Sequence, residues 1–194
     1  LGHLKYEGEY KIVMCFSDKY YFRKAILPSY KANRSDKRKP LAYSAMVQWV
    51  IGNFTTIHMP FLEADDVIGI LATEPETNNV IISGDKDMKS IPGVFYDTIH
   101  NEFYNISEEE ANYWHLYQTL VGDTADNYKG CPKIGAVGAT KLLSKEATWQ
   151  VVVSAFEKAG LTEEDALTQA RVARILRYGE YDYAKDIPIL WKPN

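Results

Sequence analysis

The chain has 194 residues, 46% hydrophobic and 25% charged, with a formal net charge of −4. This length suits one substantial domain with a small helical extension, and the composition is ordinary for a soluble globular protein. No apolar run approaches the roughly 20 residues that span a bilayer, and residues 1–10 lack the apolar core of a secretory signal. Cys15 and Cys131 are expected to be free thiols in a reducing compartment, so we expect a cytoplasmic protein.

The first half of the chain alternates apolar runs with charged segments, and each predicted element follows from the spacing of its apolar residues. In chain order we predict a buried strand at 11–17, a basic loop or irregular helix at 19–40, a helix at 40–54, a short strand at 55–58, a helix at 65–73, a buried strand at 79–83 and two strand candidates at 94–98 and 102–106.

The second half is predicted to be mostly helical. Ser107 and Glu110 have the spacing of a capping box and open a helix that runs to about residue 121. A glycine-punctuated stretch at 122–143 follows, and then helices at 148–159 and 163–177, the latter opened by Thr162 with Asp165. Strands that alternate with helices predict an α/β fold with a mainly parallel central sheet. We expect an α/β core at 1–121 and a helical region at 122–194.

Acidic residues cluster at the expected ends of these elements. Asp18 ends the first strand and Asp85 ends the strand at 79–83, where open α/β sheets gather their ligands. Any one of these acids could instead be a solvated charge, or a helix cap favoured by the helix dipole. Eight carboxylates at one rim would repel each other, and a hard cation bound by oxygen resolves this. The eight are Asp18, Glu63, Asp65, Asp66, Asp85, Asp87, Asp123 and Asp126.

Two Mg²⁺ or Mn²⁺ ions are the expected cofactors, because no Cys/His set suggests zinc. A pair of such ions could stabilise the attacking and leaving oxygens of a phosphodiester displacement. The net negative charge is a weak objection to nucleic-acid binding. Without the eight acids, eighteen Asp and Glu remain against twenty-two Lys and Arg.

The segment 19–40 is basic and interleaved with aromatic residues, while Asp36 is its only acid after Asp18. Aromatic rings can stack on unpaired bases while the cations follow the phosphate backbone. Alone, this segment could equally be a solvated basic loop, but it leaves directly from Asp18. The basic residues are Lys19, Arg23, Lys24, Lys31, Arg34, Lys37, Arg38 and Lys39.

Four blocks in order resemble the flap endonuclease and 5′→3′ exonuclease family, and especially the 5′ exonucleases of T-odd phages. The blocks are SDKYYFRKAILPSYKANRSDKRKP, LEADDVIGILAT, VIISGDKDMKSI and LVGDTADNYKGCPKIGAVGATKLL. The resemblance implies a PIN-like, FEN-like fold. It assigns a helical arch to 19–40 and a helix–turn–helix for duplex DNA to 130–143, where a backbone turn would also hold K⁺.

The resemblance also implies individual roles. Asp18, Glu63, Asp65 and Asp66 match the first metal cluster, and the other four acids match the second. Lys31 and Arg34 match catalytic residues that contact the scissile phosphate, and Tyr30 matches an aromatic position near the substrate end. The expected DNA-binding residues are Arg23, Lys24, Tyr30, Lys37, Arg38, Lys133, Gly135, Gly138 and Lys141.

In one respect the chain departs from the family, which begins with an apolar strand ending in a metal-binding Asp. Residues 1–10 hold no such strand, so this first strand is expected to be missing from the chain. The leading hypothesis is a metal-dependent 5′→3′ exonuclease and flap endonuclease that acts in phage replication inside the bacterial host. We expect a monomer that binds DNA with a 5′ flap or 5′ end, or an RNA–DNA hybrid, and no membrane. The alternatives are a catalytically weakened, structure-specific DNA-binding module and a ribonuclease of the PIN-like class.

Overall fold

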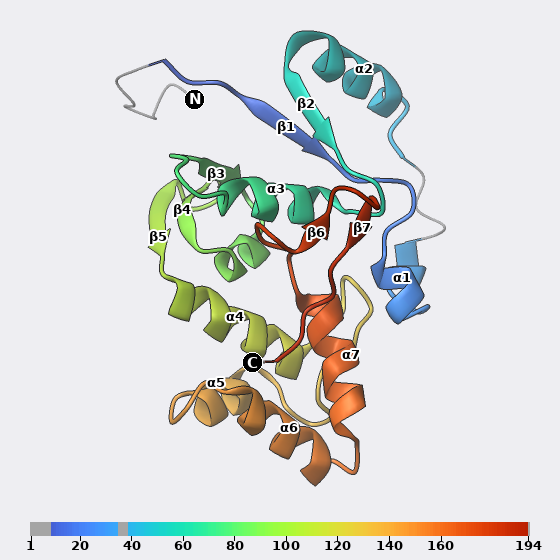
Figure 1. Cartoon of the computed structure of the whole chain (residues 1–194). Helices are drawn as coiled ribbons and strands as arrows, with labels where there is room; N and C mark the ends of the chain where they lie inside the picture. Colours follow the sequence, from blue (N-terminus) through green and yellow to red (C-terminus); the bar gives the residue numbers. More distant parts are fainter. Residues whose placement is uncertain (1–8, 35–38, 194) are drawn as a thin grey trace.

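The computed structural model describes residues 9–34 and 39–193 (Figure 1). A parallel pair, β1 (Val13–Phe16) and β2 (Thr55–His58), lies at one end of the molecule, with α2 (Tyr43–Asn53) beside it. Between β1 and α2 the chain forms two short helices, α1 (Arg23–Ile26) and η1 (Ala32–Arg34). The strand predicted at 11–17 forms, but it is not buried as expected, because Val13 and Met14 are each 37% exposed. The prediction of a missing strand falls largely on residues 1–8, outside the described residues.

A second sheet contains β3 (Val80–Ser83), β4 (Gly93–Asp97) and β5 (Glu102–Ile106), with the short helix η2 (Lys86–Ser90) between β3 and β4. The first two strands are parallel and the last pair is antiparallel. Helix α3 (Ala64–Ala72) packs against β1, β2 and β3. The predicted α/β fold with parallel strands flanked by helices is confirmed. Within 9–34 and 39–193, however, no strand hydrogen bonds join β1 to β3.

Four helices form the other end of the molecule in Figure 1: α4 (Glu108–Val121), α5 (Ala136–Leu143), α6 (Trp149–Lys158) and α7 (Glu163–Ala173). Both predicted capping boxes are present, at Ser107 and at Thr162. Leu120, Val152 and Phe156 are buried between these helices. The last helix ends four residues before the predicted position.

The C-terminal tail, with β6 (Tyr181–Asp182) and β7 (Ile187–Pro188), returns to the α/β part and packs on α3. Gly69 permits this approach, because a Cβ there would lie 2.3 Å from the Leu176 carbonyl oxygen. The amide of Leu176 donates to Asp66 Oδ1 at 3.1 Å. The tail therefore packs against the buried side of α3 and holds it in place. The division into an α/β core at 1–121 and a helical region at 122–194 remains a prediction.

Helix α2 forms where apolar residues at helical spacing predict a helix, but its apolar side chains are not buried. Trp49 is 61% exposed, and Leu41 just before the helix is 99% exposed. Among the described residues, no helix is both long and apolar enough to cross a membrane.

Candidate active site

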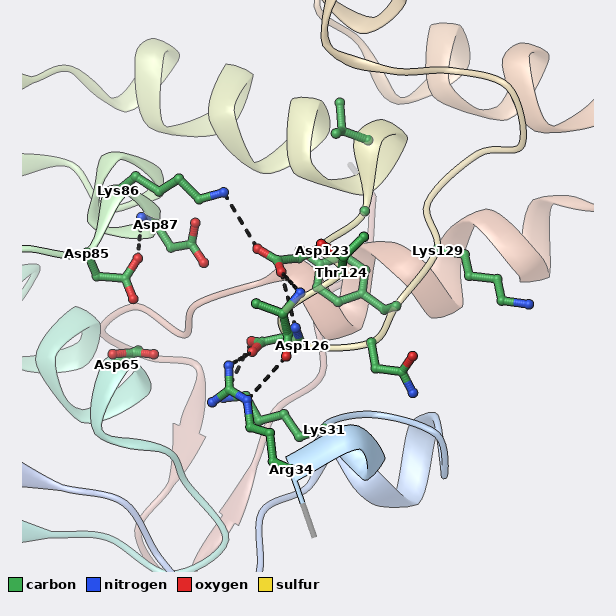
Figure 2. A pocket seen from close by; sticks show the side chains of 15 residues that line it. Lys31, Arg34, Asp65, Asp85, Lys86, Asp87, Asp123, Thr124, Asp126 and Lys129 are labelled. Carbon is green, nitrogen blue, oxygen red and sulfur yellow. Dashed lines mark hydrogen bonds and ion pairs between the residues drawn. The ribbon is translucent and has the colours of Figure 1, made fainter. Parts of the chain in front are cut away.

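A pocket of about 730 Å³ lies where η2, the start of α3, residues 121–129 and the segment around η1 meet (Figure 2). Acidic and basic side chains share its walls. The acids are Asp65, Asp85, Asp87, Asp123 and Asp126, and the bases are Lys31, Arg34, Lys86 and Lys129.

The paired acids after β3 are placed by the turn that ends the strand. Asp85 follows β3 and caps η2, accepting the amide of Asp87 at 2.9 Å. Asp87 lies in the first turn of η2 and is half-buried. The carboxyl end of a parallel strand thus delivers two carboxylates to the pocket, as the sequence pattern predicts.

A tight turn after α4 supplies the other pair. Asp123 Oδ1 accepts the amides of Ala125 at 2.6 Å and Asp126 at 3.1 Å. Gly122 has φ 72°, and a Cβ there would lie 2.4 Å from the Lys129 carbonyl carbon, so glycine is required. The turn is therefore built by its own first aspartate and by the glycine that ends the helix.

Two of these acids lie in an environment that disfavours negative charge. Burial, followed by the charges of Asp66 and Asp85, raises the pKa of Asp65 to about 6. Burial, followed by the charge of Asp85, raises the pKa of Asp87 to about 7. Both shifts mean that added positive charge would stabilise the ionised pocket.

The basic side chains at the rim already compensate part of this charge. Lys31 Nζ lies 2.5 Å from Glu63 Oε1 and 3.4 Å from Asp126 Oδ2, and Arg34 also pairs with Asp126. Lys86 lies 3.6 Å from Asp123 Oδ2. Figure 2 shows the pairs with Asp126 and Asp123 as dashed lines, and Lys129 points away from them.

Carboxylate oxygens are the donors that Mg²⁺ and Mn²⁺ prefer, so the pocket has the right ligand type. Within residues 9–34 and 39–193, no three Asp, Glu, His or Cys side chains are close enough together to hold an ion as they stand. Lys31, Arg34 and Lys86 hold Asp126 and Asp123 in their present positions. Cation binding therefore requires an exchange of these ion pairs and a turn of the carboxylates.

A second acidic group is buried behind the pocket and is neutralised. Arg23 donates to both oxygens of Asp66, at 2.6 and 2.7 Å, and to Glu63 at 2.9 Å. Asp66 is fully buried, and its oxygens also accept the amides of Glu63 and Leu176. Arg23 and these amides occupy the Asp66 oxygens in this structure, and the role of Asp66 as a metal ligand stays a prediction. Glu63 does not line the pocket and is held by Arg23, Lys31 and Tyr30.

Two predicted DNA-binding residues belong to this buried group. Arg23 and Tyr30 are each 3% exposed, so neither can contact phosphate or stack on a base in this structure. Tyr30 donates to Glu63 at 3.0 Å and to Asp126 at 2.9 Å. Their acceptors come from distant parts of the chain, and a DNA-binding role for either residue stays a prediction.

Asp18 also lies outside the pocket. Its Oδ2 accepts the amide of Phe61 at 2.8 Å and its Oδ1 accepts that of Lys19 at 2.6 Å. The Phe61 amide is the main cause that lowers the pKa of Asp18. The eight expected metal ligands therefore divide into five acids in the pocket and three outside it: Asp18, Glu63 and Asp66.

The remaining predicted DNA contacts lie on the surface, apart from Lys37 and Arg38, which are outside the described residues. Lys24, Lys133 and Lys141 are exposed, and Gly138 is half-buried. Gly135 caps α5 and is exposed, and a Cβ built on it meets no atom within 4 Å. The amides at the start of α5 thus face open space.

Two basic residues of the pocket were not among the expected site residues. Lys86 stands between the paired aspartates, where it could screen the acids or touch a phosphate, and in this structure it pairs with Asp123. Lys129 follows the acidic turn. Proximity to the acidic motifs was the only signal in the sequence for either residue.

Comparison with known proteins agrees with this architecture. Residues 2–112 match the family described as 5′-3′ exonuclease, N-terminal resolvase-like domain. The chain is 34% identical to the exonuclease of Escherichia phage T7 and 33% identical to the exodeoxyribonuclease of Enterobacteria phage T3. In both cases the match covers 94% of this chain and 74% of the relative.

Solved structures share the fold at low sequence identity. A bacteriophage T5 protein co-crystallised with metal ions has a TM-score of 0.66 and 16% identity, covering 84% of this chain and 75% of that one. A T5 flap endonuclease variant in a pseudo-enzyme–product complex with DNA and metal ions has a TM-score of 0.65, covering 83% and 72%. The match to the family model and the phage relatives at 33–34% identity show that the chain belongs to the 5′-3′ exonuclease family.

Proposed function

We propose that this chain is a metal-dependent nuclease that hydrolyses phosphodiester bonds at the 5′ ends and 5′ flaps of DNA during replication. The observation that carries the proposal is the pocket, which five aspartates line together with Lys31, Arg34 and Lys86. Membership of the 5′-3′ exonuclease family supports the reaction class. The metal ions and DNA named for the T5 proteins support the cofactor and the substrate.

Asp85, Asp87 and Asp65 are the residues that would hold Mg²⁺ or Mn²⁺, with Asp123 and Asp126 joining when their ion pairs exchange. These ions, two in the full site, would lower the pKa of the attacking water and stabilise the leaving oxygen. The raised pKa values of Asp65 and Asp87 support this assignment, because they reflect a need for positive charge.

Lys31 and Arg34 are the proposed catalytic residues. Both now pair with Asp126 at the pocket rim, so a short movement would bring them to a phosphate beside the acids. Arg34 is 44% exposed, which leaves its guanidinium accessible to substrate. Their role would be to stabilise charge that develops on the scissile phosphate.

The surface beyond the pocket would hold the duplex. The exposed amides at the start of α5 suit a phosphate. Lys133 lies just before this helix and Lys141 lies on it. K⁺ could bind backbone carbonyls of this turn. Lys24 would contact the 5′ strand together with Lys37 and Arg38. Such contacts position the DNA without reading its sequence.

A labelled 5′-flap duplex incubated with the chain in Mg²⁺ or Mn²⁺, with an EDTA control, tests the proposal. We expect metal-dependent products cut from the 5′ end or at the junction. Tight flap binding without products in either metal would instead establish a DNA-binding module. Faster cleavage of a matched RNA flap would move the substrate class to RNA.

A further inference from the structure

Gln118, on α4, makes a hydrogen bond to one of the pocket acids. Its Nε2 donates to Asp87 Oδ1 at 2.6 Å, and both residues are half-buried. Gln118 is not among the residues that line the pocket. It therefore touches a proposed ligand without being able to touch the metal or the substrate directly.

This hydrogen bond differs from the ion pairs that two other pocket acids make. Asp123 and Asp126 are held by the charged groups of Lys86, Lys31 and Arg34. Among the described residues, Gln118 provides the only hydrogen bond to the Asp87 carboxylate. A neutral amide orients one carboxylate oxygen without placing a competing positive charge beside it, so the second oxygen remains free for a cation.

The position of Gln118 in the fold also links the two acid-bearing segments. Helix α4 packs against η2, which carries Asp87. The main-chain carbonyl of Gln118 accepts the amide of Gly122 at 2.8 Å, one residue before Asp123. The side chain thus fixes the η2 acid while the main chain of the same residue ends the helix that leads to the acidic turn.

We infer that Gln118 is a positioning residue of the metal site, holding the Asp87 carboxylate so that Oδ2 is available to a divalent cation. The inference rests on the proposed function, because it presumes that Asp87 is a ligand. Loss of an outer partner of a metal ligand typically weakens metal affinity by about 10- to 100-fold.

Calorimetric titration of the metal-free protein with Mn²⁺ alone, in the absence of nucleic acid, tests the inference. Gln118→Met keeps the length of the side chain and removes the donor. We expect the dissociation constant for Mn²⁺ to rise by about 10- to 100-fold in this variant. Asn112→Ala removes an exposed amide from the same helix and should leave the affinity unchanged.

Flap cleavage measured against Mn²⁺ concentration gives a second readout. Gln118→Met should need about 10- to 100-fold more metal for half-maximal rate, but approach the wild-type rate at saturation. A merely structural role would lower the rate at every concentration. If Gln118→Met does not fold, as judged by its unfolding curve, Gln118→Ala serves in the same two measurements.

The outcomes separate the inference from the proposed function. Wild-type protein that binds Mn²⁺ and cleaves, with a Gln118 variant of equal affinity, would overturn the inference and leave the function standing. Wild-type protein that neither binds Mn²⁺ nor cleaves would overturn both. If the Gln118 variant binds Mn²⁺ more weakly than both the wild type and Asn112→Ala, the positioning role is supported.

Discussion

Asp65 and Asp66 are neighbours at the start of α3, yet they lie in different surroundings. Asp66 faces inward, where Arg23 and two backbone amides occupy its oxygens. Asp65 faces the pocket, and the structure records no hydrogen bond or ion pair for its side chain among the described residues. One carboxylate holds the fold together, and the other carries charge that the protein does not neutralise.

The comparison extends to the basic residues of the segment after β1. Arg23 is buried with Asp66 and Glu63, whereas Arg34 pairs with Asp126 at the surface. A buried charge left without its partner is costly, while an exposed ion pair contributes little. The same kind of substitution should therefore cost much more stability in the buried group than at the pocket rim.

The largest expected effect is on catalysis in the pocket. Under the proposed function, Asp85→Ala with Asp87→Ala should lower flap cleavage by at least about 10⁴-fold, because the variant removes two proposed metal ligands. The melting temperature in EDTA should change little, because relief of the repulsion between the two acids offsets the loss of the Asp85 cap and of the Gln118 hydrogen bond. Rates are compared with Glu146→Ala and Glu157→Ala together, which removes two exposed acids elsewhere. Wild-type activity in the pocket variant would remove these acids from the mechanism.

The next largest effect is on stability in the buried group. Asp66→Ala should cost about 3–5 kcal/mol of unfolding free energy, because it leaves Arg23 buried and unpaired. Asp65→Ala is the matched control at the adjacent position and should cost much less. Urea unfolding in EDTA measures both. Equal losses for the two variants would contradict the division into structural and pocket acids.

A pH-dependent effect should arise from His115, which is buried between α4 and α7 and contacts the Ala170 carbonyl oxygen at 2.9 Å. Burial, followed by the charge of Arg174, lowers the pKa of His115 to about 3. The unfolded chain gains this proton first, so stability present above pH 6.5 is lost as pH falls towards 3.

Between pH 6.5 and 5 we expect the His115 contribution to fall by about 2 kcal/mol, since one pKa unit corresponds to about 1.4 kcal/mol. Urea unfolding at the two pH values checks this, with His115→Gln as the neutral reference. The variant should lose less stability than the wild type over the same range. Parallel pH profiles would show that other groups dominate.

The smallest effect concerns Arg34. Arg34→Ala should change the unfolding free energy by at most about 1 kcal/mol, because its ion pair with Asp126 is exposed. Under the proposed function, the same variant should slow cleavage clearly. A large loss of stability would place Arg34 with Arg23 as a structural residue instead.

Much of the local structure follows from the sequence. The capping boxes at Ser107 and Thr162 form as predicted, because both partners lie within one helical turn. The parallel strand ending before Asp85 also follows from its apolar run. Family membership, confirmed by the relatives, was likewise visible in four ordered motifs.

Tertiary structure alone decided which acids face which partner. Arg23 is bound by the carbonyl oxygens of Val172 and Arg174, about 150 residues away, and no local pattern could indicate that. The exposure of Trp49 and the hydrogen bond between Gln118 and Asp87 are decided in the same way. Sequence determines which residues carry charge and which turns they occupy, because these depend on near neighbours. Whether a charge is neutralised depends on contacts that only the folded chain brings together.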